Sequence, residues 1–340
     1  MQAFTLSVDA MGGDLGPAVT VPAIARALLL YPSLSVRAFI CGDISAHLAA
    51  AGLQQHPRLT LIQAQCTVGM DERPSSALRT KRDSSMGEAV KDVAEGRSQA
   101  CISAGNTGAL MALSRHFLKT LPGIDRPAIV SAMPAVNGKR VYMLDLGANV
   151  ACDSETLYQF AVMGSAMAHT VEGIDRPRVA LLNIGEEEVK GNDQVRHAAN
   201  LLQDAPSIHY VGYLEGHDIF TNKADVIVCD GFVGNVTLKT CEGIAQFFLA
   251  QLRESFGNSL WGRVLGWLVR PFIKAVYARV NPDQYNGASL VGLRGIVVKS
   301  HGNAGIDAFF NALEQALHSA ERKLPDGIES AIGTVLLDKH

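Results

Sequence analysis

The chain has 340 residues, of which 48% are hydrophobic, and its formal net charge at pH 7 is −3. A chain of this length can bury a large core, and its near balance of charge gives no reason to expect nucleic acid as a partner. Its six cysteines contain no CxxC pair, which predicts reduced thiols in a cytosolic protein. We expect no signal peptide, because the N-terminus enters a strand pattern without a basic segment followed by an apolar one. We expect no transmembrane helix, because no apolar stretch reaches ~18 uncharged residues.

Short apolar runs predict β-strands, and helical patterns lie between many of them. The first helix is expected to begin after Pro17, and another after Ser84 and Ser85, where a serine can cap and Glu88 follows. This alternation predicts an α/β fold with a mainly parallel sheet and helices on both faces, forming one catalytic unit over residues 1–340 that can divide into two lobes. The strands are expected near residues 4–9, 36–41, 59–63, 99–103, 128–133, 140–145, 178–183, 208–213, 225–230 and 295–300.

Residues 243–281 interrupt the alternation, because two helical patterns follow one another without a strand between them. Arg263, Arg270 and Lys274 recur at helical spacing, and both tryptophans fall in the same segment. We expect a protruding helical arm that contacts the membrane surface, the second subunit of a dimer, or both. An ordinary pair of dimer helices that buries both tryptophans is the alternative.

Six of the predicted strands end in a loop rich in glycine, asparagine or acidic residues. Glycine lets backbone N–H groups approach a ligand closely, and a helix N-terminus favours an anion. Since such loops gather at the carboxyl ends of parallel strands, we expect them to meet at one ligand site, and the ligand to be phosphorylated or phosphate itself. The loops are residues 9–14, 103–108, 145–149, 183–187, 230–235 and 301–305.

The common catalytic signatures are absent from the sequence. The opening loop lacks the GxGxxG spacing of a dinucleotide-binding fold, and no GxxxxGK[ST], GxSxG or HExxH occurs. A dehydrogenase, an ATPase, a serine hydrolase and a zinc hydrolase therefore have no motif to support them.

Several polar residues in these loops are candidates for chemistry, and each has a structural alternative. Lys190 can offset the charge of phosphate or of an oxyanion, or it can be a solvated lysine that neutralises neighbouring glutamates. The segment from Lys81 to Met86 can bind an anion before a helix, or form a surface turn. His301 can donate a proton to a leaving group, or bond to the backbone. The aspartates at strand ends, Asp9, Asp145 and Asp230, can equally well cap loops.

These motifs together closely resemble those of the bacterial phosphate acyltransferases of phospholipid synthesis, over nearly the whole chain and in the same order. The matching segments are residues 8–17, 81–86, 103–111, 144–149, 182–191, 229–235 and 300–302. One departure is the loop 285–292, where the family leads us to expect a proline near Ser289 and a second leucine near Val291.

The resemblance implies a fold akin to phosphotransacetylases and isopropylmalate-type dehydrogenases, and transfer of a fatty acyl group from acyl carrier protein to inorganic phosphate. It also implies a homodimer at the membrane surface, beside a membrane glycerol-3-phosphate acyltransferase, and it implies no cofactor and no metal. On this basis we expect the catalytic residues to be Lys190, His301, Asp230 and Asn235. The substrate-binding residues are expected to be Asp9, Gly12, Gly13, Asp14, Lys81, Ser84, Ser85, Asn106, Thr107, Asp145, Asn149 and Glu186.

Two other functions fit the sequence less well. A short-chain phosphotransacetylase acting on acetyl-coenzyme A has the same chemistry but gives no role to the basic, tryptophan-bearing segment. A non-catalytic membrane scaffold that recruits lipid enzymes through residues 255–280 gives no role to the ligand-type loops. Phosphate is already an anionic nucleophile, so a site of glycine loops and cations without an activated serine or cysteine suits acyl transfer to phosphate.

Overall fold

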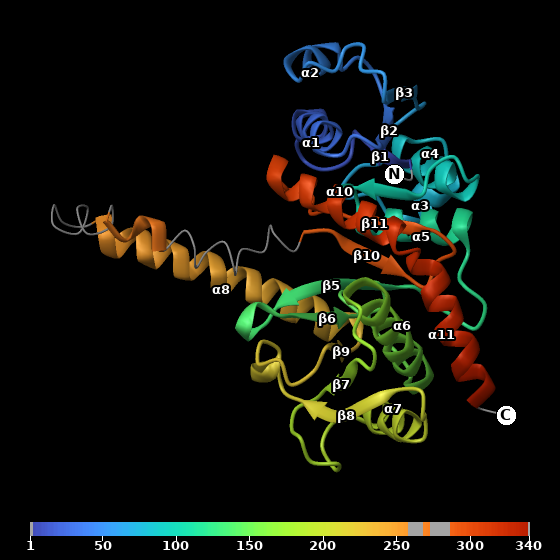
Figure 1. Ribbon diagram of the computed structural model, residues 1–340, viewed down its shortest axis with the longest axis vertical. Coiled ribbons are helices and arrows are strands. Elements are labelled where there is room, and N and C mark those ends of the chain that lie inside the picture. Colours follow the sequence, from blue (N-terminus) through green and yellow to red (C-terminus); the bar gives the residue numbers. More distant parts are fainter. Residues whose placement is uncertain (1–2, 258–267, 273–285, 339–340) are drawn as a thin grey trace.

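The computed structural model describes residues 3–257, 268–272 and 286–338. Its core is a single sheet of eleven strands with helices on both faces (Figure 1). The strands lie in the order β3-β2-β1-β4-β11-β10-β5-β6-β9-β7-β8. Their bounds are β1 Phe4–Asp9, β2 Leu34–Ile40, β3 Leu59–Gln63, β4 Ala100–Ser103, β5 Ala128–Pro134, β6 Arg140–Leu144, β7 Arg178–Leu182, β8 His209–Leu214, β9 Val226–Val228, β10 Ala288–Val291 and β11 Ile296–Lys299.

The sheet consists of two parallel blocks that run in opposite directions. Strands β3, β2, β1, β4 and β11 are parallel to one another, and so are β6, β9, β7 and β8. Between the blocks, β10 is antiparallel to both β11 and β5, and β5 is antiparallel to β6. The carboxyl ends of the strands in the two blocks therefore point in opposite directions within the continuous sheet.

The first block is covered on both faces by amphipathic helices. Helices α1 and α10 bury aliphatic and aromatic side chains such as Ile24 and Phe309 on one face. On the other face, α4 and α5 bury residues such as Val90 and Leu110. The helices of this block are α1 Pro17–Leu30, α2 Ser45–Ala50, α3 Pro74–Thr80, α4 Ser85–Ala94, α5 Thr107–Leu118 and α10 Ile306–Glu321.

The second block has its own core beneath α6, α7 and α11, with Phe160 fully buried at its centre. Two 3-10 turns, η1 Val136–Gly138 and η2 Gly216–Asp218, belong to the connections of this block. The helices are α6 Ser154–Glu172, α7 Asp193–Gln203 and α11 Leu324–Asp338.

Helix α8, Gly231–Gly257, begins directly after β9 and links the two blocks. Leu238 and Cys241 in its first half pack on the core cluster that α4 and α5 share. Its second half projects away from the sheet, and its apolar side chains Ile244, Phe247 and Phe248 are exposed (Figure 1). The arm predicted over residues 243–281 lies in part outside the described residues, as do both tryptophans.

The structure confirms the α/β class, a mainly parallel sheet and helices on both faces. Helix α1 begins at Pro17, and Ser84 caps α4 by accepting a hydrogen bond from the Gly87 N–H at 3.1 Å. Strand β10 was not predicted, because its four residues follow Gly287 in a segment that was interpreted as a loop.

Candidate active site

Strand register brings three polar side chains together at the end of the first block. Asp9 of β1 is opposite Ser103 of β4, and Ser103 is opposite Lys299 of β11. Residues in register on parallel strands point to the same face, so the carboxyl, the hydroxyl and the ammonium group form one row across the sheet.

Asp9, the acid of this row, is deeply buried, with 1% of its surface exposed. Its Oδ2 accepts a hydrogen bond from the Ser103 hydroxyl at 2.7 Å, and its Oδ1 has no hydrogen-bond partner among the described residues. Burial raises the pKa of Asp9, although the hydroxyls of Ser103 and Ser85 oppose the increase.

Two glycines allow the loop after β1 to lie directly on this row. A Cβ at Gly12 would come within 2.7 Å of the Asp9 carboxylate and 2.8 Å of the Gly105 nitrogen. Gly13 has a φ of 90°, and a Cβ there would come within 2.9 Å of the Gly302 carbonyl oxygen. The loops after β1, β4 and β11 lie so close together that only glycine fits both positions. These loops therefore interlock.

Lys299 lies inside this interlocked set of loops. Its ammonium group donates hydrogen bonds to the carbonyl oxygen of Ala104 at 3.3 Å and to that of Ser300. Burial lowers the pKa of Lys299 to about 8, the charge of Lys239 adds to the decrease, and the carboxylates of Asp9 and Asp14 oppose it.

Helix α8 brings a second set of charged groups to the same place. The Lys239 ammonium nitrogen lies 2.7 Å from His301 Nε2 and 2.9 Å from Glu242 Oε2, and Glu242 Oε1 lies 3.4 Å from His301 Nε2. Burial alone would raise the pKa of Glu242, but hydrogen bonds to His301 and Lys239 outweigh it and lower the pKa to about 2. Asn286 fixes the histidine loop by accepting the His301 N–H at 2.9 Å.

The other predicted residues of the first block surround this cluster mainly as loop supports. Asp14 is exposed and donates its N–H to Gly302. Asn106 caps α5, whose first residue is the exposed Thr107, and its side-chain amide donates to the backbone of Met70 and Glu72.

Lys81 pairs with Glu72 at 2.8 Å and also donates to the Thr67 carbonyl, so protein groups already compensate its charge. Ser84 and Ser85 are buried, and Ser85 donates its N–H to Cys66.

Asp145 and Asn149 hold together the loop after β6. Both Asp145 oxygens accept hydrogen bonds, from the N–H groups of Ile129 and Ala148 and from Asn149. Asn149 in turn donates to Pro127. Burial raises the pKa of Asp145, against the effect of these bonds. With its oxygens so engaged, Asp145 fits loop capping better than direct contact with a substrate.

Asp230 accepts the N–H of Val233 at 2.8 Å in the first turn of α8, and so acts as a cap. Asn235 is exposed one turn later, and its carboxamide lies over Gly147 of the loop after β6. The loops after β6 and β9 therefore meet at the start of α8.

Lys190 and Glu186 lie in the exposed loop between β7 and α7. Glu186 pairs with Lys223 at 3.1 Å. The carbonyl oxygen of Lys190 accepts a hydrogen bond from Asn183, while its ammonium group has no partner among the described residues. This loop belongs to the second block.

The expectation that all six loops share one edge of a parallel sheet is wrong. The loops containing Gly12, Asn106 and His301 follow strands of the first block. The loops containing Asp145, Lys190 and Asp230 follow strands of the second block, which run in the opposite direction. Alternation of strands and helices cannot reveal this reversal, because it is produced by β10 and the β5–β6 pair. Helix α8 reconnects the two sets, since it starts at Gly231 and its Lys239, about two turns later, contacts His301.

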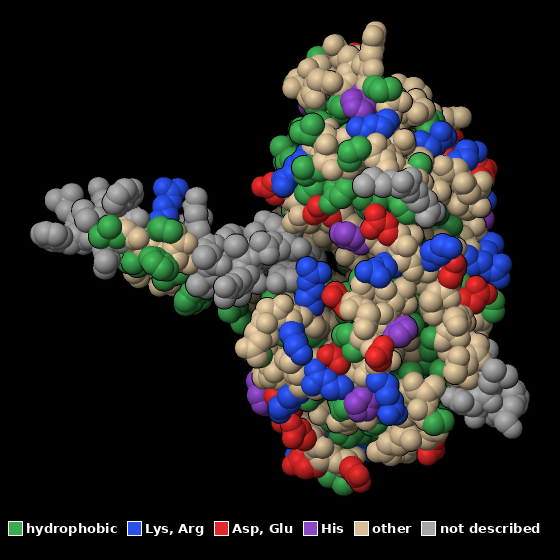
Figure 2. Space-filling view, viewed as in Figure 1, with side chains coloured by type: hydrophobic (Ala, Val, Ile, Leu, Met, Phe, Trp, Pro, Cys, Tyr) green, Lys and Arg blue, Asp and Glu red, His purple; other side chains and the backbone are tan. Residues whose placement is uncertain are grey.

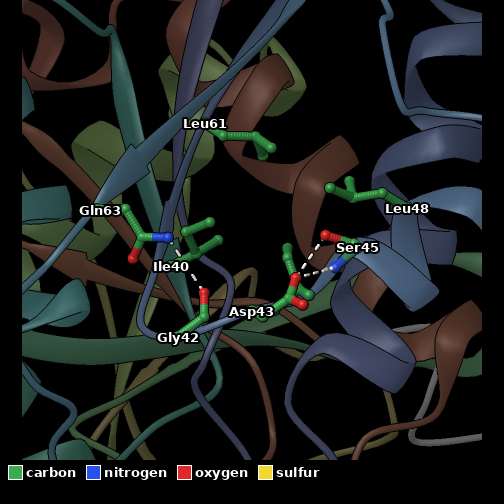
Figure 3. Close-up of a pocket in the computed structure, with 8 residues that line it drawn as sticks. Ile40, Gly42, Asp43, Ser45, Leu48, Leu61 and Gln63 are labelled. Carbon is green, nitrogen blue, oxygen red and sulfur yellow. Dashed lines mark hydrogen bonds between the residues drawn. The ribbon is translucent and has the colours of Figure 1, made fainter.

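Figure 2 shows the surface hollowed beside the base of α8, with basic, acidic and histidine side chains around the hollow. A separate apolar cavity of about 350 Å³ lies between α2 and the ends of β2 and β3 (Figure 3). Its polar groups satisfy one another, because Gln63 donates to Gly42 and Asp43 accepts from Ser45. This cavity contains no cation, so it does not suit an anionic substrate.

Sequence reasoning missed four members of the cluster around His301: Ser103, Lys239, Glu242 and Lys299. Lys239 and Glu242 carry a helical i, i+3 spacing that looks like a solvated pair. Lys299 was visible as a cation at the end of an apolar strand, two residues before a histidine. That signal was available but was not used.

The fold is that of the phosphotransacylases. The EutD phosphotransacetylase from Staphylococcus aureus superposes with a TM-score of 0.59 at 17% identity, covering 94% of both chains. A branched-chain phosphotransacylase from Enterococcus faecalis gives 0.60 at 15% identity, covering 93% of this chain and 99% of the other.

A family model described as "Fatty acid synthesis protein" matches residues 4–326, and the chain belongs to this family. A protein of Shewanella sp. (strain W3-18-1) named "Phosphate acyltransferase" is 54% identical over 341 residues, covering 99% of both chains. A protein of the same name from Shewanella baltica (strain OS155) is 53% identical with the same coverage.

Proposed function

We propose that this protein transfers a fatty acyl group from acyl carrier protein to inorganic phosphate, giving an acyl phosphate for phospholipid synthesis. The observation that carries the proposal is the cluster of Lys239, Lys299 and His301 among interlocked glycine loops, in a chain that belongs to the fatty acid synthesis family. Cations and close backbone approach suit a phosphate nucleophile, and the names of the curated relatives point to the same reaction.

The cysteines support direct attack by phosphate rather than a covalent enzyme intermediate. Burial raises the pKa of Cys101 and Cys229 well above the usual value, and that of Cys152 to about 12. These thiols stay protonated at neutral pH and are poor nucleophiles. The Ser103 hydroxyl is fully buried and engaged with Asp9.

In the proposed reaction a phosphate oxygen attacks the thioester carbonyl carbon, and the carbonyl oxygen becomes an oxyanion. The C–S bond then breaks, and the thiolate leaves with a proton. We assign proton donation to His301, because Lys239 can return a proton to it through Nε2. Lys190 and the exposed Asn235, from the second block, are assigned to the carbonyl oxygen.

The same proposal includes a homodimer and peripheral membrane contact, which would deliver acyl phosphate to a membrane glycerol-3-phosphate acyltransferase. Ile244, Phe247 and Phe248 form an exposed apolar stripe on the projecting part of α8, at the i, i+3 and i+4 positions of a helix. Among the described residues, no helix is both long and apolar enough to cross a membrane.

The arm is tested with the double variant Phe247→Glu and Phe248→Glu, compared with Gln246→Glu as a matched control on the same exposed turn. Loss of liposome binding with an intact dimer supports a membrane surface. Dissociation of the dimer instead assigns the stripe to the subunit interface, and binding and dimer both unchanged would refute both roles.

The reaction itself is tested by incubating the enzyme with inorganic phosphate and either long-chain acyl carrier protein or acetyl-coenzyme A. Phosphate-dependent formation of acyl phosphate from the carrier-bound substrate supports the proposal. A preference for acetyl-coenzyme A would identify a short-chain phosphotransacetylase, and no phosphate-dependent cleavage of either thioester would refute an acyltransferase.

A further inference from the structure

Two lysines approach His301 from different elements of the fold. Lys239 comes from the third turn of α8, and Lys299 ends β11 two residues before the histidine. The two ammonium groups are close enough for the charge of Lys239 to lower the pKa of Lys299. Two like charges that lie close together in a folded protein require compensation by other groups. The hydrogen-bond partners of the two ammonium groups therefore show whether that compensation is complete.

Lys299 lacks a carboxylate partner. An ammonium group has three protons to donate, and only backbone carbonyl oxygens, those of Ala104 and Ser300, accept from it. Among the described residues no carboxylate lies within ion-pair distance of Lys299. Asp9 and Asp14 act on it only through their more distant charge, and burial raises the pKa of Asp9. Lys299 is only partly exposed, and charges withdrawn from water are normally paired, so its remaining donor is suited to an anion.

Lys239 is held at the mouth of the same cluster. Glu242 and His301 each take one of its protons, which leaves a third donor without a partner among the described residues. Glu242 also contacts His301, so a single carboxylate fixes both groups in position. Asn286 anchors the main chain at His301 by accepting its backbone N–H, so the strand end that carries the ring is fixed.

The loops around the two lysines are built for close approach. Gly12, Gly13 and Gly302 let the surrounding loops pack closely, and a Cβ at Gly13 would come within 2.9 Å of the Gly302 carbonyl oxygen. Closely packed backbone together with two ammonium groups suits a small, doubly charged oxyanion better than a bulky ligand.

We propose that inorganic phosphate, the acyl acceptor of the proposed reaction, binds between the ammonium groups of Lys239 and Lys299 beside His301. This inference rests on the proposed function and specifies it further, since it assigns the acceptor site to the first block and to α8. Lys190, in the second block, is then left to act on the acyl thioester. A phosphodiester, such as the one in the phosphopantetheine arm of acyl carrier protein, has related chemistry and is the alternative source of the anion.

The test compares Lys239→Met and Lys299→Met with the charge-retaining Lys239→Arg and with Lys91→Met as a control. Lys91 is a partly exposed lysine of α4 that pairs with Glu88 outside the cluster. Each lysine offers phosphate a charge-assisted hydrogen bond, so loss of one lysine should raise the KM for phosphate by ~10-fold or more. The KM for the acyl thioester should change less than ~2-fold, and Lys239→Arg should recover most of the loss.

Two results would overturn the inference. One is an increase in the KM for acyl carrier protein with an unchanged KM for phosphate, which would assign the lysines to the phosphodiester of the donor. The other is a decrease in kcat alone, with phosphate binding unchanged in calorimetry. If Lys299→Met fails to fold, the outcome for Lys239→Met, on the exposed side of α8, decides the question.

Calorimetric titration of inorganic phosphate into the intact protein separates this inference from the proposed reaction. If the wild-type protein cleaves no thioester but binds phosphate, and Lys239→Met weakens that binding ~10-fold, the reaction is wrong and the site is right. If the wild-type protein and Lys239→Met bind phosphate equally, or neither binds it, the site is wrong whatever the reaction is.

Discussion

The Lys239 ammonium nitrogen lies 2.7 Å from His301 Nε2, and this contact joins the helix that leaves the second block to a strand end of the first. Lys239 lies nine residues after Asp230, so α8 connects the loop after β9 to the loop after β11. A substrate that spans both sets of loops would therefore contact both blocks. The contact depends on the third partner, Glu242, which holds the lysine and contacts the histidine.

Replacement of Glu242 with glutamine should release Lys239 and His301 from their fixed positions. We expect kcat to fall by ~10-fold, because the proton donor loses its orientation, while the protein still folds. The matched control is Glu254→Gln, an exposed glutamate farther along the same helix. Steady-state kinetics of both variants provide the measurement, and an unchanged kcat for Glu242→Gln would contradict a role for this contact.

The pKa of Glu242 also predicts a dependence of stability on acid. Its folded-state pKa of about 2 is below the ordinary value of 4.5, so the unfolded chain binds the proton more tightly. The stabilisation is fully present above pH 4.5 and is lost as the pH falls toward 2. Urea unfolding between pH 7 and pH 3 should therefore show a smaller acid-dependent loss of unfolding free energy for Glu242→Gln than for the wild-type protein.

The pKa of Lys299 predicts that phosphate binding weakens at alkaline pH. Burial lowers its pKa from 10.5 to about 8, so the ammonium form is present below pH 8 and is lost above it. Since phosphate binding requires the charged form, the KM for phosphate should rise as the pH increases from 8 to 9.5. Lys239, Asp9 and Asp14 also act on this group, and bound phosphate itself should raise its pKa. A KM that stays constant over that range in the wild-type protein would argue against Lys299 as a phosphate ligand.

Gly12→Ala should impair the site without touching a charged group. The new Cβ would come within 2.7 Å of the Asp9 carboxylate and 2.8 Å of a backbone nitrogen, so the loop must shift. We expect a loss of activity of ~10-fold or more, because displacement of a substrate-positioning loop by about 1 Å is costly. Gly42→Ala is the control, since a Cβ there meets no atom within 4 Å, although its positive φ adds some strain. Equal activity in the two variants would contradict the close approach at Gly12.

Asp92 provides a prediction about stability alone. It is fully buried and bonds to Arg37 at 2.9 Å, to Arg97 at 2.7 Å and to the Ser98 hydroxyl. Removal of one partner from a buried ion pair leaves charges uncompensated, so Asp92→Ala should lower the unfolding free energy by about 3 kcal/mol.

In contrast, Glu88→Gln, in a more exposed pair on the same helix, should cost less than about 1 kcal/mol. Chemical denaturation measures both variants, and similar values for the two would contradict the structural role of Asp92.

The sequence predicted the class of fold and most strand positions, because short continuous apolar runs and glycine loops are local signals. Helix α1 at Pro17 and the Ser84 cap were predicted for the same reason. The reversal between the two blocks was not, since it depends on the pairing of β10 with β11 and β5, which are distant in sequence.

In the candidate site, too, residues with a local sequence signal were predicted and residues that depend on contacts between distant elements were not. His301 and the glycine loop after β1 were recognisable from their motifs, whereas Lys239 and Glu242 look like a solvated helical pair until α8 is placed beside β11. Lys81 was expected at the site as a cation, but its charge is neutralised by Glu72, nine residues earlier. No local sequence pattern predicts that ion pair.

The central claim is that phosphate accepts a long-chain acyl group directly from acyl carrier protein. The most direct measurement is phosphorus-31 NMR of a reaction that contains the purified enzyme, long-chain acyl carrier protein and inorganic phosphate. We expect an acyl phosphate signal that depends on the enzyme and grows as free carrier thiol appears in equal amount. Release of thiol without any acyl phosphate, or an acyl phosphate signal only with acetyl-coenzyme A, would contradict it.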